Sequence, residues 1–261
     1  MKKSINKTIY TYFEEKTMPP YVNLCLKTWE NNVPKDYKIE KINRKNLFKY
    51  IPEKFLPDSL YAKCCVEKEC SFPYFYDLVA AYVLWLHGGI FLDADTIMTD
   101  KFDPQEALLE ATDLVVFSDG IKNICSGFMM ANKNSEVLEE LIRRYKFAAF
   151  LPVKPKTPRN FIFNDTIADF SSNDVILLDC EDYGYLMEKS MYGIFNEYLY
   201  KKYYFTDVCS TADFFENSKG LTALHNSMTP EKFKKTEEKE FLNLNILLSK
   251  IFKNILTAQT A

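Results

Sequence analysis

The sequence predicts an α/β protein with a mostly parallel central sheet flanked by helices, and three observations support this. The chain opens with a strand, a helix and a second strand, an order that favours parallel pairing. A long apolar helix ends at Gly88 and leads directly into a short apolar strand. Further strand-like runs then alternate with a helical run. Parallel strands need such crossovers, which are usually helices.

The opening β-α-β order comes from residue type and from proline placement. Residues 5–13 mix β-branched and aromatic side chains, which favours a strand. Pro19-Pro20 begins a helix over 21–31, because proline is accepted in a first helical turn. Residues 37–42 then read as the second strand.

The next elements end at a pair of glycines. Residues 44–70 predict short helices with polar breaks. The apolar pattern of residues 71–86 predicts a helix. Gly88 is expected to end it by adopting the left-handed backbone conformation. Its apolar positions occur all round, so the helix should be buried, and its single charge, Asp77, needs a partner.

The second half predicts shorter elements and a terminal helix. We expect strands over 113–117, 124–131, 175–178 and 193–205, and the last of these has a helical alternative. We also expect a helix over 135–147 and a loop over 151–160. The tail from Pro230 to Ile255 predicts one helix with an apolar side formed by Phe241, Leu244, Leu248, Ile251, Phe252 and Ile255. That side either docks on the domain or lies on a lipid surface. We therefore expect a single domain over 1–229 and a helical tail over 230–261, packed on the domain or on a membrane surface.

Composition excludes several classes of function. A chain of 261 residues with 47% hydrophobic content can bury one sizeable core. The net charge of −3 argues against a nucleic-acid partner. The seven cysteines form no regular framework and are expected to be reduced. No apolar signal core follows the N-terminal lysines, and the longest apolar run, Leu78 to Leu86, is too short to span a bilayer. We expect a cytoplasmic protein.

The segment Gly-Gly-Ile-Phe-Leu-Asp-Ala-Asp, residues 88–95, is the strongest chemical signal. Side chains alternate along a strand, so Asp93 and Asp95 should project to the same side where the strand frays into a loop. Two adjacent carboxylates suit Mg²⁺ or Mn²⁺, which favour a diphosphate as a further ligand. The alternative is a solvated, Asp-rich turn without a ligand.

Several segments in order carry a family resemblance. They are residues 5–12 with Trp29 downstream, Asp77 eleven residues before Gly88, the segment 88–95, and Leu224-His225-Asn226-Ser227-Met228-Thr229-Pro230. Together they resemble the capsular-polysaccharide-synthesis branch of the DXD-motif sugar transferases, glycosyltransferase family thirty-two. The resemblance spans most of the chain, and its specific part is the block from Asp77 to Asp95.

The resemblance implies a GT-A fold, a single Rossmann-like domain that binds a nucleotide-sugar donor and a divalent cation, usually Mn²⁺, and transfers the sugar with retention to a saccharide or glycolipid acceptor. It places Thr11 and Tyr12 at the base and Asp77 at the nucleoside. Asp93 would hold the ribose or a metal-bound water, and Asp95 would contact the metal directly. His225 would be a further metal ligand or phosphate contact. Asn226 and Ser227 would hydrogen-bond the phosphates.

One departure from the family pattern and two alternatives remain open. The family usually has Ser before the helix aspartate and Arg three residues after it, whereas this chain has Tyr76 and Ala80. Another cation, Lys63, Lys68 or Arg159, would have to replace that Arg. Asp93 and Asp95 also resemble the nucleophile strand of haloacid-dehalogenase-type phosphatases. The second alternative is a sugar-nucleotide-binding protein that has lost turnover.

Overall fold

The chain forms two compact units, each assembled from three segments. A computed structural model describes residues 5–13, 18–56, 72–120, 124–150, 161–192, 194 and 196–258. Unit 1 comprises Met1–Phe13, Lys38–Leu92 and Gln105–Leu178. Unit 2 comprises Glu14–Tyr37, Asp93–Pro104 and Asp179–Ala261. The chain passes from unit 1 to unit 2 between Leu92 and Asp93, within the segment 88–95. The turn of that segment that carries Asp93 and Asp95 is called the DXD turn below.

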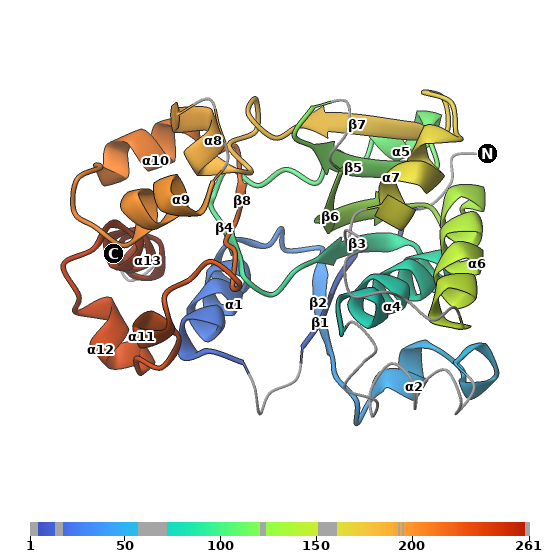
Figure 1. The fold of residues 1–261 in the computed structure, drawn as a ribbon, viewed down its shortest axis with the longest axis horizontal. Coiled ribbons are helices and arrows are strands. Elements are labelled where there is room, and N and C mark those ends of the chain that lie inside the picture. Colours follow the sequence, from blue (N-terminus) through green and yellow to red (C-terminus); the bar gives the residue numbers. More distant parts are fainter. Residues whose placement is uncertain are drawn as a thin grey trace. The chain divides into compact units, whose positions relative to one another are not determined.

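Unit 1 is built on a sheet (Figure 1), which has six strands among the described residues, in the order β2-β1-β3-β6-β5-β7. The strands are β1 (Thr8–Tyr12), β2 (Lys38–Ile42), β3 (Gly89–Leu92), β5 (Leu114–Ser118), β6 (Ile124–Ala131) and β7 (Val175–Asp179). Strand β1 pairs in parallel with β2 and β3, whereas β6 runs antiparallel to β3 and β5. Strands β1, β2, β3 and β5 therefore point the same way, which confirms the predicted α/β class with a mostly parallel sheet.

Helices cover this sheet and bury its apolar side chains. They are α2 (Leu47–Tyr50), the 3-10 helix η2 (Glu53–Phe55), α4 (Phe72–His87), α5 (Leu108–Ala111), α6 (Glu136–Phe150) and α7 (Phe161–Ala168). Helices α4 and α6 pack side by side (Figure 1). Val79, Ala81 and Val83 of α4 are fully buried, as the all-round apolar pattern predicts. Apolar burial of this kind is the main force that holds the unit together.

The end of α4 confirms the predicted role of the two glycines. Gly88 has a φ of +68° and its N–H bonds to the Leu84 carbonyl at 2.7 Å, a left-handed helix end. Gly89, with a φ of +107°, begins β3, where an added Cβ would lie 2.6 Å from the Thr8 carbonyl oxygen. Both positions therefore require glycine, and they set where the strand that leads to Asp93 begins.

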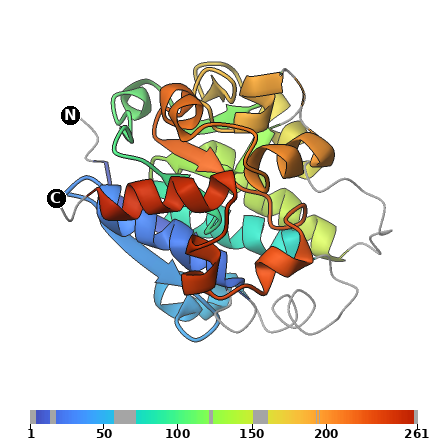
Figure 2. The ribbon, with the colours of Figure 1, turned by 90° about the vertical axis from the view of Figure 1, so that its left-hand side faces the viewer.

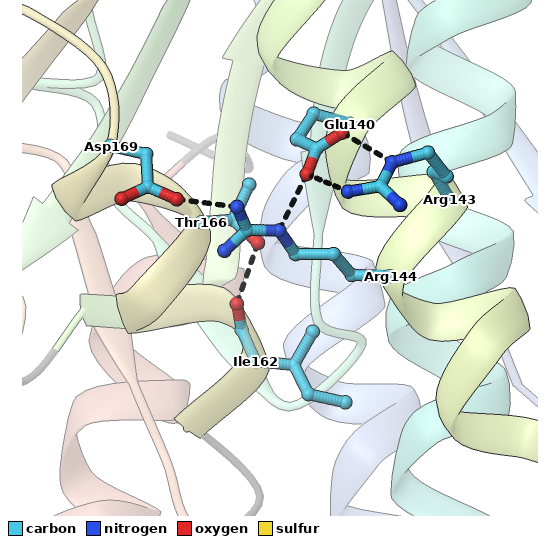
Figure 3. Close-up of polar contacts among 6 residues, drawn as sticks. All are labelled: Glu140, Arg143, Arg144, Ile162, Thr166 and Asp169. Atoms are coloured by element: carbon cyan, nitrogen blue, oxygen red, sulfur yellow. Dashed lines mark hydrogen bonds and ion pairs between the residues drawn. The ribbon is translucent and has the colours of Figure 1, made fainter. Parts of the chain in front are cut away.

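An ion-pair cluster ties α6 to the end of α7 (Figure 3). Glu140 accepts hydrogen bonds from Arg143 and Arg144, each at 2.6 Å, and Arg144 also binds Asp169. The arginines lower the pKa of the Glu140 carboxyl to about 2; the bonds from Arg143 are the first cause and those from Arg144 the second. Within α7, the Thr166 hydroxyl donates to the Ile162 carbonyl at 2.7 Å.

Unit 2 surrounds a two-stranded antiparallel sheet with helices. The strands are β4 (Thr96–Met98) and β8 (Leu221–Ala223), which pair Thr96 with Ala223. The helices are α1 (Pro20–Asn32), α8 (Met187–Tyr192), α9 (Glu197–Tyr204), α10 (Thr211–Asn217), α11 (Glu231–Lys234), α12 (Glu238–Leu242) and α13 (Leu247–Thr257). Helix α13 packs against α1 (Figure 2). The core between the helices is aromatic, with Tyr200, Tyr203, Phe241 and Phe252 fully buried.

The expected strand over 193–205 is wrong, and the helical alternative is the correct one. Helix α9 occupies Glu197–Tyr204, and the Asn196 side chain caps it by accepting from the Leu199 N–H at 2.9 Å. Tyr200, Tyr203 and Tyr204 lie three and four positions apart, so one helix face buries all three rings. The β propensity of tyrosine is overridden by this packing.

The single helix expected over 230–255 is also wrong, because the tail breaks into α11, α12 and α13. The backbone is extended at Glu237 and Ile246, with ψ values of 148° and 155°. These breaks allow Phe233, Phe241 and Phe252 all to point into the core of unit 2. Because this core buries the apolar side chains of α13, they are not available to a lipid surface. No helix among the described residues combines the length and apolarity needed to cross a membrane.

Other expectations fall partly or wholly outside the described residues. The loop expected over 151–160 lies outside them, and only α2 and η2 represent the short helices expected over 44–70. Cys25, Cys125, Cys180 and Cys209 form no disulfide with one another among the described residues, and the reduced state stays a prediction. The division into 1–229 and 230–261 stays a prediction.

Candidate functional site

Asp93 and Asp95 lie in the tight turn that connects β3 with β4. The Thr96 N–H donates to the Asp93 carbonyl at 3.1 Å and closes the turn, and β4 begins at Thr96. Both aspartate side chains are half-buried. The strand alternation expected of this pair does not apply, because the backbone has already turned at Asp93. The position of Asp95 is instead set by strand β4, which follows it directly.

Pairing of β4 with β8 brings Asp95 next to the His225 segment, far away in sequence. The Leu224 N–H donates to the Asp95 carbonyl at 3.0 Å, one residue beyond the Thr96–Ala223 pair. The Asn226 N–H then donates to Asp95 Oδ2 at 3.1 Å. Three residues predicted for the site, Asp95, His225 and Asn226, therefore come together, with the Asp95 carboxylate held by the backbone of the other segment.

The His225 segment is a compact turn that buried tyrosines hold in place. The His225 carbonyl accepts from the N–H groups of Met228 and Thr229, both at 2.9 Å. The His225 N–H donates to the Tyr200 hydroxyl at 3.0 Å, and the Tyr200 ring packs edge-on against the imidazole. The Tyr21 hydroxyl donates to Asn226 Oδ1 at 3.1 Å. Asn226 and Ser227 themselves are exposed.

Side chains of α1 hold the other edge of β4. The indole N–H of fully buried Trp29 donates to the Thr96 carbonyl at 2.6 Å. The Met98 N–H donates to the Thr28 hydroxyl at 2.9 Å, and the Asn32 amide donates to the Met98 carbonyl at 3.0 Å. The helix thus satisfies backbone groups that would otherwise need a third strand. The sequence pattern singled out Trp29 but could not assign this contact.

Burial, and to a smaller extent the charge of Asp95, raise the pKa values of three groups near this carboxylate. Burial is the largest cause of the raised pKa of Tyr21, of Cys25 and of Tyr200, and the negative charge of Asp95 adds to it in each case. These groups therefore stay neutral at physiological pH. The Asp95 carboxylate supplies the negative charge and the hard oxygen atoms that a cation prefers.

The donor set fits a metal that the substrate helps to hold. No group of three or more His, Cys, Asp or Glu side chains that could hold a metal ion is present within the described ranges. Mg²⁺ is commonly held by one or two carboxylates together with substrate phosphates. Such a site does not require three ligating side chains from the protein. Asp93 and Asp95 supply the hard oxygen atoms that these cations prefer. The metal roles of Asp93, Asp95 and His225 stay predictions.

The site residues predicted in unit 1 are all buried. Thr11 is 0% exposed, and its hydroxyl has no hydrogen-bond partner among the described residues. Tyr12 packs edge-on against Phe75 and Tyr76 of α4, with ring centroids 5.7 and 5.0 Å apart. Asp77 is 4% exposed. The base-binding and nucleoside-binding roles of Thr11, Tyr12 and Asp77 stay predictions.

The position of the missing family Arg is part of the core of unit 1. Ala80 is 2% exposed and belongs to the apolar cluster around α4. A guanidinium at this position would displace apolar packing, so Ala80 suits the structure that surrounds it. The cations considered as replacements, Lys63, Lys68 and Arg159, lie outside the described residues.

Sequence reasoning missed Glu188, Tyr21 and Tyr200. Glu188 is a fully buried carboxylate whose Oε1 lies 3.5 Å from His225 Nε2. Its neighbours in the sequence, Met-Glu-Lys-Ser-Met-Tyr, resemble an ordinary exposed helix. No local pattern marks it, because the contact is made by a segment far along the chain.

A comparison with protein families gives a match over nearly the whole chain. A family model described as capsular polysaccharide synthesis protein matches residues 2–244. Over 157 residues the chain is 21% identical to the O-glycosyltransferase braB of Annulohypoxylon truncatum, a match that covers 54% of this chain and 37% of that protein.

Solved structures with a similar chain path have low sequence identity. The apo-form glycosyltransferase GlyE of Streptococcus pneumoniae TIGR4 is 12% identical with a TM-score of 0.49, over 97% of this chain and 60% of that chain. A glycosyltransferase involved in glycosylation of the major capsid of PBCV-1 is 10% identical with a TM-score of 0.39, over 87% of this chain and 97% of that chain. The chain thus spans less than two thirds of the length of braB and of GlyE.

Proposed function

Since the chain belongs to the capsular polysaccharide synthesis protein family, we propose that it is a glycosyltransferase acting in surface polysaccharide synthesis. It moves a sugar from a nucleotide-diphosphate-sugar donor to a saccharide acceptor, which can be lipid-linked. The curated relative named as an O-glycosyltransferase supports group transfer to an oxygen atom. The resemblance to DXD-motif transferases supports a GT-A fold, Mn²⁺ or Mg²⁺ as the cofactor, and retention of anomeric configuration.

The contact that carries the proposal is the hydrogen bond from the Asn226 N–H to Asp95 Oδ2 at 3.1 Å. It joins the DXD turn to the His-Asn-Ser turn, the two segments that the resemblance assigns to the cation and the diphosphate. A solvated Asp-rich turn would not need a second, distant segment to hold its carboxylate. Pairing of β4 with β8 gives this contact a rigid support.

The chemistry to be served is departure of a nucleoside diphosphate, which builds negative charge on phosphate oxygens. When bound, the cation would stabilise that charge as a Lewis acid. Asp93 and Asp95 would hold it, with Asp93 reaching the ribose or a metal-bound water. Loss of one preorganised stabilising group of this kind commonly costs about 10²-fold in rate or more.

Exposed groups of the His225 turn are suited to bind the phosphates. The Asn226 side chain accepts from the Tyr21 hydroxyl through Oδ1, which leaves its amide N–H groups to donate to an anion. The Ser227 hydroxyl is exposed in the same turn. Both would donate hydrogen bonds to phosphate oxygens, and the burial-raised pKa of Tyr21 keeps it a donor to Asn226.

Analysis of reaction products tests the proposal. The full chain is incubated with a panel of nucleotide-sugars, with Mn²⁺ or with a chelator, and separately with a small phosphomonoester. Mn²⁺-dependent release of nucleoside diphosphate is expected. Release of inorganic phosphate from the phosphomonoester would instead indicate a haloacid-dehalogenase-type phosphatase. A chain that binds a nucleotide-sugar and releases neither product would be a binding protein without turnover, and either result overturns the proposal.

A further inference from the structure

Positive charge is concentrated on one short segment of unit 1. Residues 38–56 contain six lysine or arginine side chains and two glutamates, a net charge of +4 within a chain whose net charge is −3. Lys38 and Lys41 lie on the edge strand β2, where lysine ordinarily prevents strand pairing between molecules. The other four basic residues follow after β2. A charge asymmetry of this kind indicates an anionic partner, and the function proposed above does not use these side chains.

The segment that follows β2 is fixed to unit 1 through its apolar side chains. Leu47 is fully buried and Tyr50 is 7% exposed. The Tyr50 hydroxyl donates to Glu40 Oε2 of β2 at 2.6 Å. The Tyr82 hydroxyl of α4 donates to the Phe55 carbonyl at 3.0 Å. Burial and these hydrogen bonds therefore hold α2 and η2 in place, and the residues between and around the buried ones are presented on a rigid support.

Other side chains of the same segment are exposed and mostly basic. We call five exposed residues the basic turn: Arg44, Lys45, Phe48, Lys49 and Lys54. The Lys49 side chain is 68% exposed, and its Nζ lies 3.9 Å from Glu40 Oε2 and 4.9 Å from the centroid of the Tyr50 ring. Lys54 Nζ lies 5.0 Å from the centroid of the Phe55 ring. Contacts with aromatic faces restrain these two ammonium groups and keep them charged at the surface.

An aromatic ring is exposed among these charges. Phe48 is 41% exposed and directly precedes Lys49 in α2. A phenyl ring beside lysines suits the membrane–water interface, where the ring enters the boundary of the acyl chains and the long lysine side chains reach the headgroups. Insertion would remove the ring from water, which favours a lipid surface as the partner. The acidic character of the chain as a whole argues against a nucleic acid.

We propose that the basic turn docks unit 1 on an anionic lipid membrane, with its basic side chains at the headgroup phosphates and the Phe48 ring at the edge of the acyl layer. This proposal rests on the proposed function in one respect, since a lipid-linked acceptor would lie in such a membrane. The apolar side of α13 belongs to the core of unit 2, and no described helix is long and apolar enough to cross a membrane. The basic turn gives reversible binding that weakens as salt rises.

Sedimentation with lipid vesicles tests the surface without donor or metal. The full chain is mixed with vesicles of phosphatidylcholine alone, or of phosphatidylcholine with phosphatidylglycerol, at several salt concentrations. We expect binding to the anionic vesicles that falls as salt rises, and little binding to the neutral ones. No binding to anionic vesicles, or equal binding to both kinds, overturns the proposal.

Paired substitutions then locate the surface. Each basic group near an anionic membrane contributes roughly five-fold to the binding constant. The double variant Lys45→Gln and Lys49→Gln should therefore bind anionic vesicles roughly 25-fold more weakly. The matched control, Lys250→Gln with Lys253→Gln on α13, changes the net charge equally and should bind nearly as wild type. Circular dichroism checks that both variants fold, and equal losses of binding in the two would overturn the proposal.

Phe48→Ser tests the contribution of the ring. It removes apolar surface and no charge, so binding at fixed salt should fall roughly 10-fold while its salt dependence is unchanged. Unchanged binding of folded Phe48→Ser would overturn insertion of the ring. Heparin, a soluble acidic polysaccharide, supplies the remaining comparison. Tighter binding of wild type to heparin than to anionic vesicles would make the partner a soluble polyanion and overturn the proposal.

Turnover in solution separates this surface from the proposed function. Mn²⁺-dependent release of nucleoside diphosphate from a soluble donor should be equal in wild type and in the variant Lys45→Gln with Lys49→Gln, because the basic turn is not part of the donor site. A chain that binds anionic vesicles through the basic turn but releases no nucleoside diphosphate would refute the proposed function and leave the surface intact. Release of nucleoside diphosphate without vesicle binding would refute the surface alone.

Discussion

Replacing Trp29 by phenylalanine tests whether α1 sets the position of the DXD turn. The indole N–H of Trp29 donates to the Thr96 carbonyl at 2.6 Å, one residue after Asp95, and the ring is fully buried. Phenylalanine fills most of the same space and leaves that carbonyl without its donor. An orphaned buried polar group costs about 1 to 3 kcal/mol, in addition to the loss from the smaller ring.

The other tryptophan of the chain is a matched control. Trp85 of α4 lies in unit 1, and its indole nitrogen is buried without a hydrogen-bond partner among the described residues. Trp85→Phe also shrinks the ring but removes no hydrogen bond. The free energy of unfolding, measured by urea denaturation with circular dichroism, should therefore fall by at least about 1 kcal/mol more in Trp29→Phe than in Trp85→Phe.

The two variants should also differ in nucleotide binding. Trp29→Phe loosens β4, which carries Asp95, so Mn²⁺-dependent affinity for a nucleoside diphosphate should fall well below that of Trp85→Phe. Calorimetry under conditions where both variants are fully folded measures this directly. Equal losses of stability, or wild-type affinity in folded Trp29→Phe, would refute the idea that α1 holds the turn in place.

Three further predictions concern single positions. Asp77→Ala should weaken nucleotide binding more than it lowers the denaturant midpoint, and normal affinity with a large loss of stability would make Asp77 a structural residue of the unit 1 core. Gly220→Ala should disrupt the pairing of β4 with β8, because φ is +123° and a Cβ would lie 2.4 Å from the Phe102 Cα. Mn²⁺-dependent affinity for a nucleoside diphosphate should therefore be lost. An unchanged affinity would contradict the claim that the pairing of β4 with β8 positions Asp95. The low pKa of Glu140 should contribute about 1 kcal/mol to the free energy of unfolding above roughly pH 4.5, because the folded carboxyl binds its proton less readily than the unfolded one. This contribution should be lost as the pH falls towards about 2. Glu140→Gln should flatten this part of the stability–pH curve, and an unchanged curve would show that the cluster in Figure 3 contributes nothing.

Much of the architecture could be predicted from local sequence signals. The strands over 8–12 and 124–131 and the helix that Gly88 ends follow from residue type, periodicity and glycine conformation. The errors arise where long-range packing decides. Three buried tyrosine rings make a helix of α9, and the breaks at Glu237 and Ile246 let the tail fill the core of unit 2. Short strands such as β4 and β8 have no local signature, because each exists through its partner.

The site divides in the same way. Asp93 and Asp95 could be selected from the sequence because adjacent carboxylates suit a cation, whereas His225 was selected through the family resemblance. The structure brings Asp95 and the His225 turn together. Glu188, Tyr21 and Tyr200 could not be selected, since their roles depend on contacts with segments far along the chain. Supporting residues of this kind become visible only once the fold is known.

The central claim is that Asp95 holds a cation on which donor binding depends. The most direct test is calorimetric titration of a nucleoside diphosphate into the full chain, with and without Mn²⁺. Wild type is compared with Asp95→Asn and with a control, Asp100→Asn, which changes an exposed aspartate beyond β4. We predict Mn²⁺-dependent binding in wild type and in Asp100→Asn, and a loss of roughly 10- to 100-fold or more in folded Asp95→Asn. Undiminished Mn²⁺-dependent binding in Asp95→Asn would contradict the account.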